Sequence, residues 1–306
     1  MRFLKYLLSL FIKGIKNPTL VYFFFLKRII RFFCKYFDIH PTSEPFISGD
    51  TFKNLATYYY NGKKIKINKP EIIFTNTFFL KKFSKKINYI DYPFILITHL
   101  SDVLVDDEFL PIIKNSKLVH WYAQNCIISH KKISNIPIGL EDRWRHDNGV
   151  VSDFKKLRKI KDKKIPRVLC SFNIISNVSA RKEAYNTLKE LNVTDFFRGY
   201  APVYRKKLNN YMFVACPEGN GIDTHRVWEA LYLGVMPITI NKNFFSNFKN
   251  IPMLFLNKWK DLEDYSENDL KSIYKKNVHK FKSSKYIWID FWKKDIKKKY
   301  DKLNKI

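Results

Sequence analysis

Cysteine is scarce in this chain, and the few cysteines lie far apart. The 306 residues include four, Cys34, Cys126, Cys170 and Cys216, and no two of them form a CxxC pair. Isolated cysteines of this kind argue against a zinc site and against a disulfide framework. We therefore expect a reducing, cytosolic setting, with Cys170 and Cys216 as small core residues in apolar runs.

Long apolar runs are also missing, and a helix that spans a membrane would need one. Residues 1 to about 36 alternate apolar clusters with lysines and arginines, and Pro18 interrupts the pattern. No cluster reaches the ~20 residues of a spanning helix, and no small-residue cleavage site marks a signal peptide. The pattern predicts amphipathic helices that lie on the anionic cytoplasmic face of a membrane. A helix packed on the body of the protein is the alternative.

Common nucleic-acid signatures are absent despite the strongly basic composition. The formal net charge of +28 favours anionic partners, such as a membrane surface or phosphorylated substrates. Part of this excess reflects a composition rich in Lys, Ile, Asn and Phe. No arginine-rich run, zinc-finger spacing or stacked-aromatic RNA signature accompanies the charge, so we expect no nucleic-acid partner.

The most informative stretch that is present runs from Tyr211 to Phe245. Tyr211 to Cys216 is an apolar run suited to a buried strand, and a second run, Met236 to Ile240, follows a helix that ends at Gly234. The loop Glu218-Gly219-Asn220-Gly221 stands between the first strand and the helix. Because open parallel sheets bind ligands at the carboxyl ends of their strands, this loop is predicted to face a ligand crevice.

The start of the predicted helix has the features of a phosphate site. Asp223 or Thr224 can cap it, and its first N–H groups lack intrahelical partners, so an anion is stabilised there. Arg226 can donate two N–H bonds to a diphosphate, and the carboxylate of Glu229 suits two ribose hydroxyls. The loop matches neither GxxxxGK[ST] nor GxGxxG, and Gly-rich turns also occur as simple connections.

The run CPEGNGIDTHRVWEALYLGVMPI resembles the carboxyl-terminal signature of exostosin-like glycosyltransferases. In that family a strand leads to a Pro-x-Gly loop, then an Arg, a Glu-Ala-Leu helix and a Gly-x-x-Pro turn. The resemblance is strong from Tyr211 to Phe245 and weaker from about Pro45 to Trp259. This chain is shorter than the animal exostosins, so we expect a short microbial or viral-type member, and the resemblance does not indicate which sugar it transfers.

The resemblance implies a GT-B-like α/β fold, in which two Rossmann-like domains with parallel sheets face a central cleft. It implies that Arg226 binds the diphosphate of a nucleotide-sugar donor and Glu229 its ribose, with no bound metal and no further cofactor. The chain shows no prominent Asp-x-Asp pair. The other candidate donor-binding residues are Gly219, Asn220, Gly221, Asp223, Thr224, His225, Asn173 and Arg181.

Polar residues recur just past the apolar runs of the first half of the chain. The runs Ile72 to Phe74, Phe94 to Thr98 and Leu118 to Tyr122 are predicted to be strands. The polar residues predicted to face the acceptor, unless they are simple connectors, are Asp50, His99, Asp102, Gln124 and Asn125. The resemblance implies an inverting single displacement, for which Asp102 is the first candidate base, Asp50 the second and His99 the third.

The sequence divides into four expected segments. Residues 1–40 form the membrane-interface segment, 41–160 an acceptor-side domain, 161–262 the nucleotide-sugar-binding domain, and 263–306 carboxyl-terminal helices. A charged linker is predicted from Lys155 to Lys164. The last helices are expected to cross back over the first domain or to touch the membrane.

The expected function is sugar transfer from a nucleotide-sugar to a hydroxyl of a glycan or lipid-linked acceptor. A role in polysaccharide biosynthesis at the inner face of a membrane, in the cytoplasm, fits the basic amino-terminal segment. The alternatives are a catalytically inactive nucleotide-sugar-binding protein and a peripheral membrane scaffold.

Overall fold

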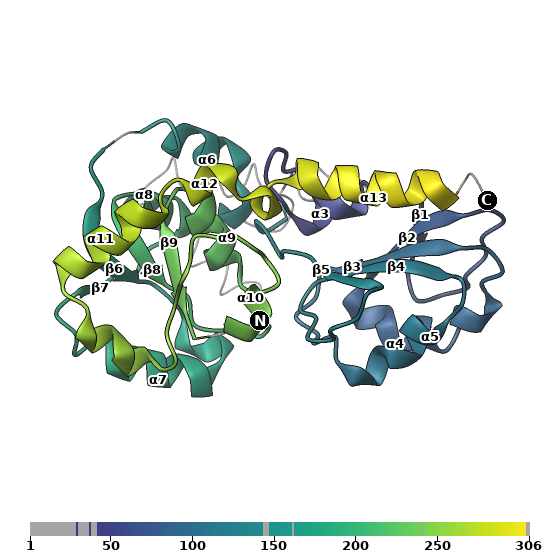
Figure 1. Cartoon of the computed structure of the whole chain (residues 1–306), viewed down its shortest axis with the longest axis horizontal. Helices are drawn as coiled ribbons and strands as arrows, with labels where there is room; N and C mark the ends of the chain where they lie inside the picture. Colours follow the sequence, from purple (N-terminus) through teal and green to yellow (C-terminus); the bar gives the residue numbers. More distant parts are fainter. Residues whose placement is uncertain are drawn as a thin grey trace.

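The structure, a computed structural model, describes residues 42–142, 147–160, 162–240 and 242–303, and Ile29 and Phe37 in addition. The amphipathic helices predicted for residues 1–40 thus lie outside the described residues, apart from these two positions. The described chain contains two five-stranded parallel sheets (Figure 1). This confirms the α/β class with two parallel sheets that the sequence predicts.

The strands of the first sheet follow one another in space as they do in the chain. They are β1 (Tyr58–Tyr60), β2 (Glu71–Asn76), β3 (Phe94–His99), β4 (Leu118–Ala123) and β5 (Ile133–Asn135). Right-handed crossovers in such an order place the connecting helices on one face, where α4 (Leu80–Ser84) and α5 (Leu110–Lys114) lie (Figure 1). The opposite face must therefore be covered by other parts of the chain.

The carboxyl-terminal helix α13 (Ile289–Leu303) provides most of that cover, beside α3 (Gly49–Lys53) (Figure 1). The Tyr122 hydroxyl of β4 donates to Asp295 Oδ2 at 2.5 Å, and the Tyr300 hydroxyl donates to the Pro70 carbonyl at 3.3 Å. The last helix thus crosses back over the first sheet. We call this sheet and the helices on its two faces the first lobe.

Buried strands explain the apolar runs of the first half. Ile95 and Ile97 of β3 face α13, while Phe94 and Leu96 face α4 and α5, because successive residues of a strand point to opposite faces. The cluster on the α13 side continues without a break into the core of the second half. The two lobes therefore share this cluster, while the α4 and α5 side of the first sheet has a cluster of its own.

The second sheet has a different strand order. In space its strands are β10 (Leu254–Phe255), β9 (Met236–Thr239), β8 (Tyr211–Ala215), β6 (Ile165–Cys170) and β7 (Thr194–Phe196). Its helices are α6 (Val151–Leu157), α7 (Val178–Leu188), α8 (Ala201–Asn209), α9 (His225–Tyr232), α10 (Lys242–Phe245), α11 (Glu267–Asn277) and α12 (Lys280–Ser283). Gly234, with φ of +66°, follows α9 as predicted. We call this half the second lobe.

The predicted linker from Lys155 to Lys164 is not a free connection. Its first residues belong to α6, whose buried Phe154 and Leu157 supply the apolar face. Arg158 then donates from Nη1 to the Tyr232 carbonyl at 3.0 Å, and its guanidinium lies 4.7 Å from the Trp288 ring centroid. The many lysines of this run give it the composition of a linker, although its first residues end a short amphipathic helix that packs on the second lobe.

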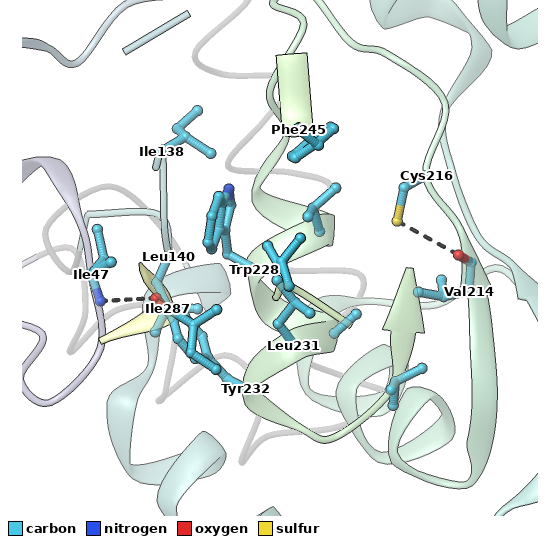
Figure 2. Packing of buried hydrophobic residues seen from close by; sticks show 14 of the residues in the cluster. Ile47, Ile138, Leu140, Val214, Cys216, Trp228, Leu231, Tyr232, Phe245 and Ile287 are labelled. Atoms are coloured by element: carbon cyan, nitrogen blue, oxygen red, sulfur yellow. Dashed lines mark hydrogen bonds between the residues drawn. The ribbon is translucent and has the colours of Figure 1, made fainter. Parts of the chain in front are cut away.

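Helix α9 lies at the boundary between the lobes. The Ile47 amide of the first lobe donates to the Tyr232 hydroxyl at 3.0 Å, and both residues are buried (Figure 2). Trp228 of the same helix is fully buried and belongs to the shared core. The helix predicted to carry the site is therefore fixed against both halves of the protein.

Candidate functional site

The second sheet reverses its winding between β6 and β8. The chain leaves β6 toward β7 on one side and leaves β8 toward β9 on the other. A crevice forms at the carboxyl ends of parallel strands where such a reversal occurs. Arg181 follows β6 on α7, and Arg226 follows β8 on α9. The two side chains predicted to bind phosphate therefore come from the two sides of this reversal.

Arg181 is anchored by main-chain carbonyls. Its Nε donates to the Glu218 carbonyl at 2.7 Å, and its Nη1 donates to the Asn173 carbonyl at 2.8 Å. The residue is only 6% exposed. Burial, followed by the nearby charge of Arg226, lowers the pKa of Arg181 to about 10. The guanidinium is thus oriented and still protonated at neutral pH, and it repels a second cation beside it.

Arg226, the second residue of α9, is that second cation. Its Nε is buried and has no hydrogen-bond partner among the described residues. The Tyr204 hydroxyl is close to its guanidinium. No carboxylate in the described part of the chain forms an ion pair with Arg181 or Arg226. An anion bound between the two guanidiniums would remove their repulsion and satisfy the free donors.

The start of α9 adds further donors. Thr224 occupies the N-cap position but makes no capping hydrogen bond, and its buried hydroxyl has no partner within the described ranges. The first N–H groups of the helix are therefore not satisfied by a side-chain cap, and the helix dipole adds partial positive charge. Free N–H groups and two guanidiniums together are a suitable site for a phosphate.

Asp223, predicted to cap α9 or to bind the donor, instead connects the two lobes. Its Oδ2 accepts from the Ile138 amide at 2.8 Å, and the Trp228 indole N–H donates to Oδ1 at 2.8 Å. Its own amide donates to Asn125 Oδ1 at 3.1 Å. The residue is 2% exposed, and burial raises its pKa to about 7. The carboxylate is already satisfied by protein donors, so Asp223 and Asn125 hold the two lobes together.

The glycines of the loop make room for protein side chains. A Cβ atom at Gly219 would lie 2.9 Å from Arg181 Nη2, and one at Gly221 would lie 2.5 Å from Asn125 Nδ2. Asn177, which the sequence did not single out, donates from Nδ2 to the Gly219 carbonyl at 2.9 Å. Close packing of Arg181 and Asn125, rather than access for a ligand alone, thus accounts for both glycines.

His225 faces a carboxylate of the first lobe. Its Nδ1 donates to the Gly139 carbonyl at 2.8 Å, and its Nε2 lies 3.6 Å from Glu141 Oε2. Burial opposes protonation, but the Glu141 carboxylate and the Gly139 carbonyl raise the pKa of His225 above its ordinary value. His225 thus contacts the first lobe and does not cap the helix. Nothing in the sequence linked Glu141 to it, since the two lie far apart in the chain.

Glu229 lies one turn after Arg226, as predicted, but it is only 6% exposed. Burial raises its pKa, and the charges of His225, Arg226 and Arg205 oppose that effect. Asn173 is used as a cap, because its Oδ1 accepts from the Ile175 amide at 3.1 Å. Glu229 is close to Arg226, and Asn173 contacts Arg181 only through its main-chain carbonyl, which accepts from Nη1.

Asp102 is the candidate base that contacts the loop Glu218-Gly219-Asn220-Gly221. It is exposed, it follows β3, and its Oδ2 accepts from Asn220 Nδ2 of the second lobe at 3.2 Å. Asp50 is instead fully buried at the start of α3, where its amide donates to Asp142 Oδ1 at 2.9 Å. Burial, and then the Asp50 charge, raise the pKa of Asp142 to about 7. This position does not favour Asp50 as a base.

His99 also has a structural position. Its Nε2 donates to the Pro137 carbonyl at 3.0 Å, and its Nδ1 accepts from the Leu100 amide at 2.7 Å. Leu100 has a φ of +67°, a strained value for a bulky residue, and the imidazole stabilises that turn. Gln124 is buried as well, and its Oε1 has no partner in the described ranges. With both ring nitrogens engaged, His99 is not favoured as a base.

Comparisons with known proteins assign no family to the chain. No protein-family model matches it, and no curated protein matches it either. Within the described ranges, no group of three His, Cys, Asp or Glu side chains is placed to hold a metal ion. No helix in that part of the chain has the length and apolar character required to cross a membrane.

Proposed function

We propose that this protein transfers a sugar from a nucleotide-sugar donor to a hydroxyl acceptor, with its two lobes arranged as in GT-B enzymes. The pair Arg181 and Arg226 is the observation that supports this most directly. Both guanidiniums lie at the switch point of the second sheet without an ion-paired carboxylate among the described residues. A diphosphate has the charge, and enough oxygens, to accept hydrogen bonds from both. The resemblance of the surrounding sequence favours the diphosphate of a nucleotide sugar.

In the proposed reaction the bond between the anomeric carbon and the diphosphate oxygen breaks while the acceptor oxygen attacks that carbon. Negative charge then develops on the leaving oxygen, beside the two guanidiniums and the first N–H groups of α9. Positive groups that are fixed before the reaction stabilise such a transition state most effectively. Arg181 meets this condition, because two main-chain carbonyls already hold it.

Asp102 is the base in this proposal. Its carboxylate belongs to the first lobe and contacts Asn220, in the loop that leads to α9. An acceptor hydroxyl between the lobes would donate its proton to this carboxylate as it attacks from the side opposite the leaving group. The configuration at the anomeric carbon is then inverted.

A release assay with a panel of UDP-, GDP- and CDP-sugars tests the proposal. The wild-type protein should release nucleoside diphosphate from at least one donor, and Arg226→Gln should lower that rate by about 100-fold or more. Arg198 is exposed, and Arg198→Gln, with the same charge change, should keep the wild-type rate. An inactive nucleotide-sugar-binding protein would bind a donor and release nothing. If the wild type neither binds any donor nor releases nucleoside diphosphate from one, the proposal is rejected.

We propose further that the acceptor is a glycan or a lipid-linked glycan at the inner face of a membrane. The basic and apolar residues of positions 1–40 support this setting, together with the net charge of +28.

A further inference from the structure

A hollow lies between the first lobe, including its helix α13, and the second lobe, and none of the residues at the start of α9 lines it. Its volume is about 710 Å³, within the range of roughly 300 to 1,000 Å³ that is usual for ligand sites. The first lobe contributes residues from and before β5, and the second lobe contributes Asn247. The helix α13 and the residues before it supply the remaining wall.

One wall of this cavity is aromatic. The ring centroids of Tyr286 and Phe291 are 4.9 Å apart, and those of Phe291 and Trp292 are 5.0 Å apart. Tyr286 and Phe291 are partly exposed, whereas Trp292 is buried and fixes the cluster to the core. The Lys285 ammonium lies 5.3 Å from the Tyr286 centroid and 4.6 Å from the Phe291 centroid, so a ligand would use the ring surface that Lys285 does not cover. Rings that pack on one another in this way are rigid and have little freedom to lose on binding.

The other walls present hydrogen-bond acceptors beside the basic side chains of His130, Lys131 and Lys299. Asn135 and Asn247 each donate through Nδ2 to a main-chain carbonyl, Cys126 O at 2.8 Å and Phe244 O at 2.9 Å. These bonds orient the two amides and leave both Oδ1 atoms without a partner in the described part of the chain. Asp295 Oδ2 accepts from Tyr122 and from Lys299, each at 2.5 Å, while no described group binds its Oδ1.

Asp295 is ionised at neutral pH. Burial works against the charge, but the hydrogen bonds from Lys299 and Tyr122 hold its pKa below the ordinary value. Asp295 is paired with Lys299, and Lys131 also lines the cavity, so the wall offers donors as well as acceptors. Hydroxyl groups can match both, because each one donates and accepts, and a hydrogen bond from a hydroxyl to a carboxylate is stronger than one to a neutral oxygen.

We propose that this cavity binds a neutral saccharide segment, with the apolar side of a sugar ring on Tyr286 and Phe291 and its hydroxyls on Asn135, Asn247 and Asp295. A sugar combines an apolar ring face with hydroxyls that can donate to the amide and carboxylate oxygens and accept from Lys131. A short chain of contacts links the cavity to the residue before α9: Asn135 contacts the carbonyl of Cys126, and the preceding Asn125 accepts from the amide of Asp223. The further role of the cavity as an acceptor subsite rests on the proposed sugar transfer, but saccharide binding does not.

Saturation-transfer NMR with neutral hexasaccharides of glucose, N-acetylglucosamine, galactose and mannose tests the proposal. At least one should bind the full-length protein, and Asn135→Ala, Asn247→Ala and Phe291→Ala should each weaken that binding by about fivefold or more. Asn268 is exposed on α11, and Asn268→Ala should bind as the wild type does. Circular dichroism of each variant, compared with the wild type, establishes that it is folded.

Arg226→Gln separates this inference from the proposed transfer reaction. It should lower donor cleavage by about 100-fold or more and leave hexasaccharide binding unchanged. Saccharide binding without any donor cleavage by the wild type would reject the transfer reaction and support the cavity. The cavity proposal fails if no hexasaccharide binds, if folded Asn135→Ala, Asn247→Ala and Phe291→Ala bind normally, or if only a polyanionic glycan binds.

Discussion

Protonation of His99 is expected to destabilise the folded protein at mildly acidic pH. The ring is 1% exposed, Nε2 donates to Pro137 O at 3.0 Å, and Nδ1 accepts from the Leu100 amide at 2.7 Å. A second ring proton would turn the acceptor of the Leu100 N–H into a donor and place a charge in the core. Burial therefore lowers the pKa of His99 to about 3, from an ordinary value of 6.5.

The sign of the effect follows from proton counts. Between pH 6.5 and about 3 the unfolded chain holds a proton on this ring that the folded protein does not hold. The free energy of unfolding therefore falls as the pH falls, by about 1.4 kcal/mol per pH unit. From pH 6.5 to 5.0 the loss attributable to His99 amounts to about 2 kcal/mol.

Urea unfolding of the wild type and of His99→Gln, at about pH 7 and about pH 5, measures this loss. The wild type should lose about 2 kcal/mol more than the variant over that interval. His279 is exposed, and His279→Gln should follow the wild type. A difference between wild type and His99→Gln that does not change with pH would mean that the folded ring titrates normally. The assigned hydrogen bonds would then be wrong, and His99 would again be a candidate base.

Three further predictions concern the lobe boundary and the amino-terminal segment. Tyr232→Phe leaves the buried Ile47 amide without its acceptor and should cost about 1 to 3 kcal/mol in urea unfolding; no loss would show that this amide has another partner. Gly139→Ala should lower the melting temperature, because φ is +68° and the new Cβ would lie 2.2 Å from the Ile47 carbonyl oxygen; an unchanged melting temperature contradicts this. Deletion of residues 1–36 should prevent sedimentation with anionic vesicles, and persistent sedimentation would place the membrane contact elsewhere.

The strands of the core could be predicted because each of them is a run of consecutive apolar residues. Phe94 to Thr98 and Tyr211 to Cys216 are apolar on both sides, which is the pattern of a parallel strand covered on two faces. The sequence did not decide whether α13 returns to the first sheet or contacts the membrane. The apolar face of this helix can pack on any apolar surface, and the sequence does not specify that the first sheet lacks cover on one face.

The candidate site could be predicted where the position of a residue follows from the strand that precedes it in the chain. Arg226 lies at the start of α9 as predicted, and Arg181 reaches it because both follow neighbouring strands. The contacts of Asp223 and His99 could not be predicted, since their partners Ile138 and Pro137 are distant in sequence. In the sequence, a buried polar residue that bonds to main-chain groups cannot be distinguished from one that binds a ligand.

Direct binding of a diphosphate tests the central claim, which is that the start of α9 is an anion site built from two guanidiniums. Calorimetric titration of the full-length protein with inorganic pyrophosphate, UDP and GDP should show binding of at least one of them. Arg181→Gln and Arg226→Gln should each weaken it by about tenfold or more, because each removes a charge-assisted contact. Arg198→Gln, at an exposed position, should retain the wild-type affinity. Equal affinity in all four proteins, or no binding by the wild type, would contradict the account.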